Sequence, residues 1–139
     1  MIDQITVFLE NKEGHLADLV RTVSAAGVNM EALTVADTSA YGLVRIVCSN
    51  PGAAKKALEE AGYRATLTKV VAVSVENVPG GLARLLDVLD QQDVNIEYAY
   101  CFSHKEAGAL DVLKVRNANE AVKAIEAAGF KLIEQDDLA

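Results

Sequence analysis

Two short turns in this sequence contain residue types that can bind a small zwitterionic molecule. Residues 11–16 read NKEGHL and residues 77–82 read NVPGGL, and an amphipathic segment begins within each. The free backbone N–H groups and the positive dipole end of a helix start favour a carboxylate. Amide side chains in both turns, and at Asn29 and Asn95 further along, can donate to a carboxylate and accept from an ammonium without adding a charge. The chemistry indicated is binding.

The two turns belong to an internal repeat. Gly14 matches Gly80 at a shift of 66 positions, and the segments around both glycines match in the same register. Later in the repeat the shift is 67 positions, as from Gly62 to Gly129, so one residue is gained in between, where we expect a loop. Each copy of such a repeat is one structural unit. We therefore expect two units, at residues 1–68 and 69–139.

The hydrophobic period switches between two and 3.6 along each copy, and these periods predict the elements. Ile5, Val7 and Leu9 alternate with more polar neighbours, as is typical of a half-buried strand. Apolar residues in 16–23 and 82–89 recur every three or four positions, which indicates an amphipathic helix. The further elements expected are second strands at 29–37 and 95–103, polar turns at 38–42 and 104–108, third strands at 43–49 and 109–116, second helices around 54–61 and 121–128 that end at Gly62 and Gly129, and final strands that open at Tyr63 and Phe130.

Each copy therefore reads βαββαβ, a ferredoxin-like unit of the α+β class with two helices on one face of a four-stranded antiparallel sheet. In such a unit we expect the first turn and the start of the second strand to lie close together at one end of the sheet, where they form a pocket. His15 in the first copy corresponds to Gly81 in the second. We expect one pocket to hold an imidazole where the other leaves space for a ligand.

Composition excludes several classes of partner. Twenty acidic residues against thirteen basic ones give a net charge of −7, which repels a polyanion such as nucleic acid. The N-terminal segment has no export signal, and the apolar runs are far shorter than the ~20 residues of a membrane span, so we expect a cytoplasmic protein. Cys48 and Cys101 stand outside any CxxC or Cys/His cluster, so we expect no metal or other cofactor.

Both copies resemble ACT modules, in which a strand leads into an Asp/Asn-x-Pro-Gly-x-Leu turn, an amphipathic helix, and an apolar residue before Asn-Ile. The second copy has Pro79-Gly80 and Asn95-Ile96 at these places, and the first has Glu13-Gly14 and Asn29-Met30. The whole chain is similar to small tandem-ACT proteins described as amino-acid-binding or as related to acetolactate synthase small subunits. This resemblance implies a regulatory protein without catalytic activity that binds a free amino acid.

In that family the amino acid lies between the first turn of one unit and the second strand of its neighbour. The resemblance therefore implies two pseudo-symmetric sets of ligand contacts. The residues implied are Asn11, Lys12, Glu13, Gly14, His15 and Leu16 facing Asn95 and Ile96, and Asn77, Pro79, Gly80, Gly81 and Leu82 facing Asn29 and Met30.

Three other functions are alternatives for a protein of this topology. An acylphosphatase-like enzyme would need an arginine in the first turn, and neither turn contains one. An RNA-binding unit of this topology would need aromatic residues on its central strands, and residues 43–49 and 109–116 contain none. A structural or regulatory subunit that acts on a separate metabolic enzyme through protein contacts, without a ligand, remains open. A homodimer is expected because each sheet has open edges and an open face.

Overall fold

The computed structural model describes residues 1–37 and 41–139, and the chain divides into two compact units. The first unit contains Asp3–Thr68, and the second contains Lys69–Leu138 together with Met1–Ile2. The polar turn expected at 38–42 lies partly outside the described residues. Within the described ranges, no helix is long and apolar enough to cross a membrane.

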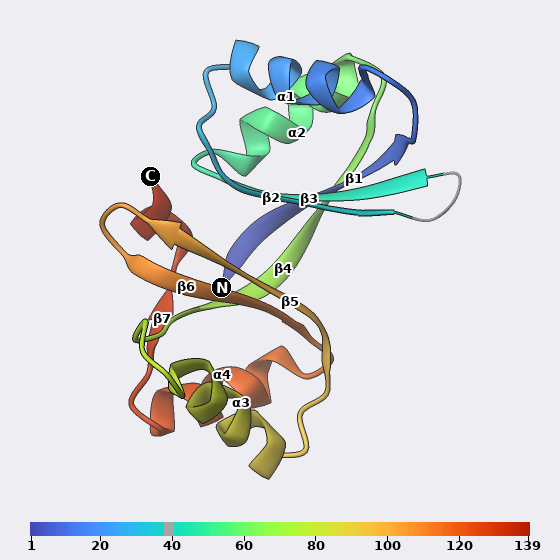
Figure 1. The fold of residues 1–139 in the computed structure, drawn as a ribbon. Coiled ribbons are helices and arrows are strands. Elements are labelled where there is room, and N and C mark those ends of the chain that lie inside the picture. Colours follow the sequence, from blue (N-terminus) through green and yellow to red (C-terminus); the bar gives the residue numbers. More distant parts are fainter. Residues whose placement is uncertain (38–40) are drawn as a thin grey trace. The chain divides into compact units, whose positions relative to one another are not determined.

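The first unit folds as βαββαβ. Its elements are β1 (Ile2–Glu10), α1 (His15–Ala25), β2 (Met30–Asp37), β3 (Tyr41–Cys48), α2 (Pro51–Glu60) and β4 (Arg64–Ser74). The strand order is β2-β3-β1-β4, and β1 and β2 each pair antiparallel with β3. Both helices lie on the same face of this sheet (Figure 1).

The second unit repeats this arrangement and begins within β4, which continues past Thr68. Its other elements are α3 (Gly81–Gln91), β5 (Ile96–His104), β6 (Gly108–Val115), α4 (Ala118–Ala127), β7 (Lys131–Ile133) and the short 3-10 helix η1 (Gln135–Leu138). The strand order is β7-β4-β6-β5, and α3 and α4 lie on the same face of the sheet (Figure 1). The predicted βαββαβ order and the α+β class are confirmed in both units.

Each helix pair packs its apolar stripe on its own sheet. Leu19 and Val23 of α1 are buried in the first unit, and Leu85 and Leu89 of α3 are fully buried in the second. Burial of one such leucine contributes about 1.5–3 kcal/mol. The predicted stripes also included Leu16 and Leu82, but these side chains are 37% and 41% exposed. The first residue of each stripe is therefore at the surface, beside the turn that precedes the helix.

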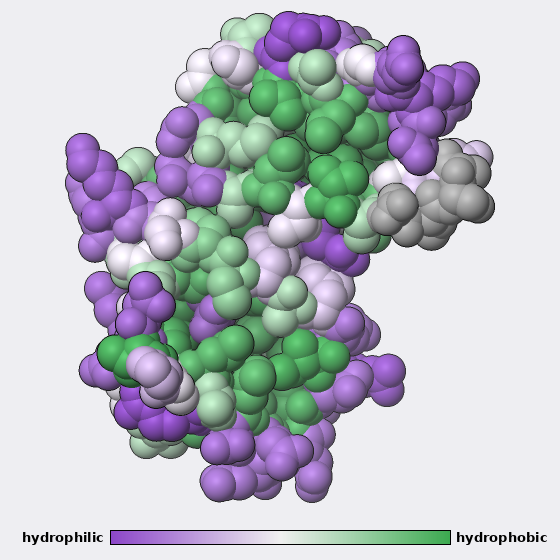
Figure 2. Space-filling model, viewed as in Figure 1, coloured by the Kyte–Doolittle hydropathy of each residue, from purple (hydrophilic) through white to green (hydrophobic). Residues whose placement is uncertain are grey.

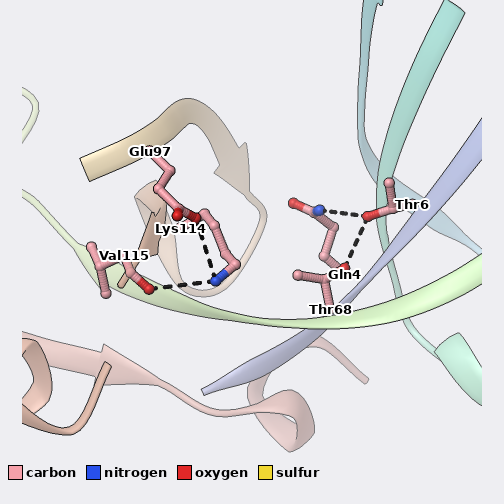
Figure 3. Close-up of polar contacts among 6 residues, drawn as sticks. All are labelled: Gln4, Thr6, Thr68, Glu97, Lys114 and Val115. Carbon is pink, nitrogen blue, oxygen red and sulfur yellow. Dashed lines mark hydrogen bonds and ion pairs between the residues drawn. The ribbon is translucent and has the colours of Figure 1, made fainter. Parts of the chain in front are cut away.

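The sheet face of the first unit that points away from its helices is partly polar. Gln4 and Thr6 alternate with core residues along β1, and the Gln4 side chain is fully buried. Its Nε2 donates to Thr6 Oγ1 at 3.0 Å, and that hydroxyl lies 3.1 Å from Thr68 Oγ1 on β4 (Figure 3). A buried amide needs such partners because losing its hydrogen bonds to water costs free energy.

The prediction that the first turn and the start of the second strand lie close together within one unit is wrong. Glu10, which precedes the first turn, pairs with Tyr41, whereas Met30 at the start of β2 pairs with Cys48. The two partners are at opposite ends of β3, about 23 Å apart at ~3.3 Å per residue. In the second unit, Ile96 likewise pairs with Val115 at the far end of β6. The reason is that the first helix returns the chain to the other end of the sheet before the second strand begins.

The predicted helix ends are confirmed. Gly62 and Gly129 follow the last turns of α2 and α4 with φ of 94° and 87°, a left-handed conformation that glycine adopts without strain. Asp93 has φ of 54° where the first unit has Gly27 at 74°. The same left-handed residue therefore ends the first helix in both units, although one unit uses an aspartate.

Candidate functional site

The two first turns have the same backbone conformation despite their different sequences. His15 N donates to Lys12 O at 3.3 Å, and Gly81 N donates to Val78 O at 3.0 Å. The third residues of these turns, Gly14 and Gly80, have φ/ψ of 80°/−12° and 84°/−5°. These values define a type II turn, which favours proline at its second position and needs a positive φ at its third. Glu13 in place of Pro79 therefore leaves the turn geometry unchanged.

The left-handed glycine of this turn can be tested by Gly80→Ala. An added Cβ meets no atom within 4 Å, so the expected loss of about 1–2 kcal/mol of unfolding free energy reports the backbone conformation alone. The control is Gly52→Ala in α2, where φ is not positive and the nearest atom, Asn50 Oδ1, is 3.8 Å away. That change should preserve stability or raise it by up to about 1 kcal/mol. Urea denaturation measures both, and equal effects would contradict the assignment.

The expectation that Gly81 leaves space for a ligand is wrong. Gly81 is buried, and a Cβ placed there would lie 2.2 Å from the backbone oxygen of Glu76. Glycine is required at this position because α3 begins too close to the backbone that follows β4 for a side chain to fit. His15, at the equivalent position of the first unit, carries a side chain that is half-buried and lines a cavity.

A cavity of about 740 Å³ lies at the first turn of the first unit. It is bounded by the end of β1, the start of α1, the facing ends of β2 and β3, and the turn between α2 and β4. Its walls combine aromatic rings with side chains of both charges. The aromatic, imidazole and charged residues on its walls are Phe8, Glu10, His15, Tyr41, Tyr63 and Arg64. Phe8 and Tyr41 are 56% and 57% exposed, so their rings are available to a bound molecule.

An ion pair and a hydrogen bond set the charge state of two groups on the wall of this cavity. The Lys12 ammonium lies 3.0 Å from the Glu10 carboxylate and holds the pKa of that carboxyl below its usual value through a hydrogen bond and its charge. Tyr63 donates its hydroxyl to the Asp18 carboxylate on α1, and burial followed by this bond raises the pKa of Tyr63 to about 12. At neutral pH the cavity therefore contains an ionised Glu10, a neutral Tyr63 and the Arg64 guanidinium.

A second cavity, of about 310 Å³, lies at the equivalent place in the second unit. It is bounded by the turn between β4 and α3, the end of β5 and the start of β6. Asn77 and Leu82 of the predicted site lie on its wall, as do Cys101 and Asp111. Glu76 also lines it, with a carboxylate oxygen 3.5 Å from the Arg84 guanidinium.

Cys101 and Asp111 face each other across neighbouring strands in this cavity. They are paired in the β5–β6 register, and Asp111 is only 6% exposed although it sits in an otherwise apolar run. Cys101 is an exposed residue, and partial desolvation of its thiol raises the pKa of Cys101 to about 11, with the contact to Asp111 and the negative charge of that carboxylate acting in the same direction. The thiol therefore stays protonated at neutral pH.

The predicted site residues divide between the two ends of each sheet. His15 lines the large cavity, Asn11 and Lys12 line a neighbouring one of about 180 Å³, and Asn77 and Leu82 line the second-unit cavity. The second-strand residues are at the other end of their own unit. The residues placed there are Asn29, Met30, Asn95 and Ile96.

The second-strand starts make local contacts instead. The Asn29 amide donates to Glu31 Oε1 at 2.6 Å, and its backbone N–H donates to Ser49 Oγ at 3.2 Å. In the second unit, Lys114 Nζ lies 3.6 Å from Glu97 Oε2 and donates to Val115 O at 3.4 Å (Figure 3). The backbone of Asn29 and the Lys114–Glu97 ion pair tie the strand starts to the ends of the third strands, whereas the Asn29 side chain contacts Glu31 on its own strand.

Several cavity residues were missed by the sequence analysis, notably Phe8, Tyr41, Arg64 and Asp111. One signal was present for Asp111. At the shift of 67 positions it corresponds to Val44, so a carboxylate replaces a core valine within the run from Leu110 to Leu113. An internal comparison of buried strands could have identified it as a candidate.

Apolar side chains also reach the surface of both units. Leu16, Leu33 and Val35 are exposed in the first unit, and Val78 and Leu82 in the second. Figure 2 shows apolar surface among polar side chains on the viewed face of each unit. The leucine at the start of α1 or α3 thus belongs to a larger set of exposed apolar groups.

Comparison with known proteins places this fold in a family. Protein BT0572 from Bacteroides thetaiotaomicron is 32% identical, with a TM-score of 0.92 over 99% of this chain and 94% of that one. The ligand-free regulatory subunit of aspartate kinase from Thermus thermophilus is 16% identical, with a TM-score of 0.64 over 91% of this chain and 92% of that one, and shares the fold. The comparison with curated proteins finds no match.

The family assignment covers the full length. The family model of the ACT domain pair matches residues 1–139, which include both turns and both cavities. This agrees with the two ferredoxin-like units seen in the structure. The chain belongs to the ACT domain pair family.

Proposed function

We propose that this protein is a regulatory module without catalytic activity that binds a free amino acid in the first-unit cavity. The observation that carries the proposal is the presence of both charges in one partly aromatic cavity, with Glu10 and Arg64 on its wall. Arg64 would hold the ligand carboxylate, since a guanidinium matches a carboxylate in shape and charge. Glu10, ionised at neutral pH, would receive the ammonium, and Phe8 and Tyr41 would cover the ligand side chain.

The cavity has the general character of a small-molecule site. Ligand sites usually occupy ~300–1,000 Å³ and combine apolar walls with a few polar groups that orient the ligand. Membership of the ACT family and the structural likeness to a regulatory subunit of aspartate kinase support a regulatory role. The sequence resemblance suggests acetolactate synthase as one candidate for the enzyme that this protein would regulate.

A homodimer is part of this proposal. Strand β2 stands at one end of the strand order in its unit, and Leu33 and Val35 on it are exposed. An edge strand with exposed apolar side chains can be covered by a second copy of the chain. Light scattering, which measures the molar mass of the purified protein in solution, would test whether the chain forms a homodimer.

The ligand proposal is tested by thermal unfolding in the presence of each of the common amino acids. A ligand at about 100 times its Kd should stabilise the folded state by about 2.7 kcal/mol, and Arg64→Gln should remove that stabilisation. The matched control is Arg21→Gln, which removes an exposed guanidinium from α1 in the same unit but outside the cavity. If no amino acid stabilises the protein, the ligand-free alternative, a subunit that acts through protein contacts alone, is favoured. If Arg64→Gln keeps the response, the first-unit cavity is not the site.

A further inference from the structure

Another cavity, of about 220 Å³, lies in the second unit on the β7 side of β4. It is bounded by the end of β4, the start of α3 and the turn between α4 and β7, whereas the second-unit cavity described above lies on the β6 side of β4. The side chains on its wall include Ser74, Glu76, Arg84, Phe130 and Lys131. This β7-side cavity therefore combines two cations with one carboxylate.

Strand pairing brings two of these groups together. Ser74 and Lys131 are register partners on β4 and β7, so their side chains stand on one face of the sheet with Cβ atoms about 4.5–5.5 Å apart. Among residues 1–37 and 41–139, Lys131 has no ion-pair partner. Arg84 has Glu76 at 3.5 Å, which is longer than the ~2.7–2.9 Å of a strong charge-assisted hydrogen bond. Both cations therefore keep N–H donors for a ligand.

The internal repeat shows that this arrangement is particular to the second unit. At shifts of 66 and 67 positions, Arg84 corresponds to Asp18 and Phe130 corresponds to Tyr63. In the first unit the tyrosine donates its hydroxyl to the aspartate. In the second unit both partners differ, so a guanidinium and a ring without a hydroxyl take the place of that hydrogen-bonded pair.

This exchange makes the β7-side cavity cationic within an acidic unit. Glu76 and Lys131 have the same charges as their first-unit counterparts, Glu10 and Arg64, so an arginine in place of an aspartate shifts the local charge by two units in the positive direction. Residues 69–139 as a whole contain twelve acidic and seven basic side chains. Two cations on one cavity wall therefore attract an anion to a unit whose net charge repels it.

We infer that the β7-side cavity binds a phosphate group, held by Arg84, Lys131 and the Ser74 hydroxyl. The inference goes beyond the proposed function and does not depend on it. A guanidinium can donate two parallel hydrogen bonds to phosphate oxygens, an ammonium acts as a point charge, and a hydroxyl adds one more donor. A phosphate has enough oxygens for all three groups, whereas a carboxylate has only two. The volume of about 220 Å³ suits a small ion or the phosphate end of a larger molecule.

Glu76 gives this site a recognisable response to mutation. Its carboxylate competes with the ligand for Arg84 and repels an anion. Glu76→Gln should therefore tighten phosphate binding severalfold. A cavity that bound a cation through Glu76 would lose affinity in the same variant.

The test uses sodium phosphate as probe, with methyl phosphate as a phosphate monoester and sodium acetate as a carboxylate, all at one ionic strength because salt screens exposed charges. In a titration of the full chain, phosphate should shift the NMR amide signals of Ser74, Arg84 and Lys131 saturably, and acetate should not. Saturable binding of methyl phosphate as well indicates an organic phosphate as the ligand, and binding of inorganic phosphate alone indicates the free ion. Arg84→Gln and Lys131→Gln should each weaken binding at least about tenfold.

Two matched controls remove exposed cations of the second unit that lie outside the cavity. Lys123→Gln on α4 and Arg116→Gln after β6 should leave the phosphate affinity unchanged. If these variants weaken binding as much as Arg84→Gln does, phosphate responds to the overall charge of the unit and the β7-side cavity is not its site.

A double variant tests whether lost binding reflects lost structure. Arg84→Asp combined with Phe130→Tyr introduces the hydrogen-bonded pair of the first unit, so it should fold and yet bind no phosphate. The inference is overturned if phosphate shows no saturable binding, if acetate binds as tightly, or if Arg84→Gln keeps the native affinity. The first-unit proposal is read out separately, because Arg64→Gln should not change phosphate binding and Arg84→Gln should not change the thermal response to an amino acid.

Discussion

Leu85→Ala is expected to lower the free energy of unfolding by about 2–5 kcal/mol. Leu85 is fully buried in the second-unit core, in the stripe of α3 that lies on the sheet. Alanine removes the transfer free energy of the lost methylene and methyl groups and leaves a cavity that the close-packed surroundings fill only in part. Chemical denaturation with urea, followed by circular dichroism, measures the loss as a lower midpoint at similar slope.

The matched control is Leu82→Ala, the same substitution one turn earlier on the same helix. Leu82 is 41% exposed and lines the second-unit cavity, so it has less apolar area to lose and its replacement should cost less than about 1.5 kcal/mol. Equal losses for the two variants would contradict the difference in burial between Leu85 and Leu82.

The second large effect concerns the reactivity of the Cys101 thiol. Its pKa of about 11, against about 8.5 for a free cysteine, lowers the thiolate fraction near pH 8 by roughly 100-fold or more. A disulfide reagent such as 5,5′-dithiobis(2-nitrobenzoate) should therefore react with Cys101 in the folded protein about 100 times more slowly than in the denatured chain. The rate should keep rising with pH until about pH 11, because the thiolate is the reacting form.

The control separates the contribution of Asp111 from that of burial. Asp111→Asn removes the negative charge beside the thiol, so the reaction should become faster, although burial, the larger cause, still keeps it slower than in the denatured chain. Cys48 is fully buried, and its thiol pKa is also raised to about 11, so mass spectrometry of the modified peptides is needed to assign the reaction to Cys101. A folded-state rate equal to the denatured-state rate would contradict the raised pKa of the thiol, and an Asp111→Asn rate equal to that of the native protein would contradict the contribution of Asp111.

Much of the fold could be predicted from the sequence because it depends on local periodicity. The alternation of Ile5, Val7 and Leu9 and the helical spacing of Leu85 and Leu89 reflect which side chains face a core, and both sets are buried as expected. Gly62 and Gly129 end helices through their backbone conformation, which the residue type alone permits. The internal repeat then implied that whatever one half forms, the other half also forms.

The candidate site could be predicted only in part, because it depends on which ends of separate strands meet. The first turns were recognised, and His15, Asn77 and Leu82 do line cavities there. The second-strand starts were assigned to the same end of the sheet, and the antiparallel register places Met30 beside Cys48 instead. The first helix returns the chain to the other end of the sheet, so the position of the second-strand start follows from the connection between elements and not from the residues around Asn29 or Asn95.

By itself the sequence determined the two βαββαβ units, their helix and strand boundaries to within a few residues, and the acidic charge that disfavours nucleic acid. The tertiary structure alone decided that Arg64 joins Glu10 at one cavity, that Gly81 is required by a backbone contact, and that Asp111 is buried beside Cys101. The physical reason is that hydrophobic periodicity depends on which face of an element is buried, and this can be read from neighbouring residues. A binding site is made by residues far apart in the chain, which come together only when the sheet is paired and packed.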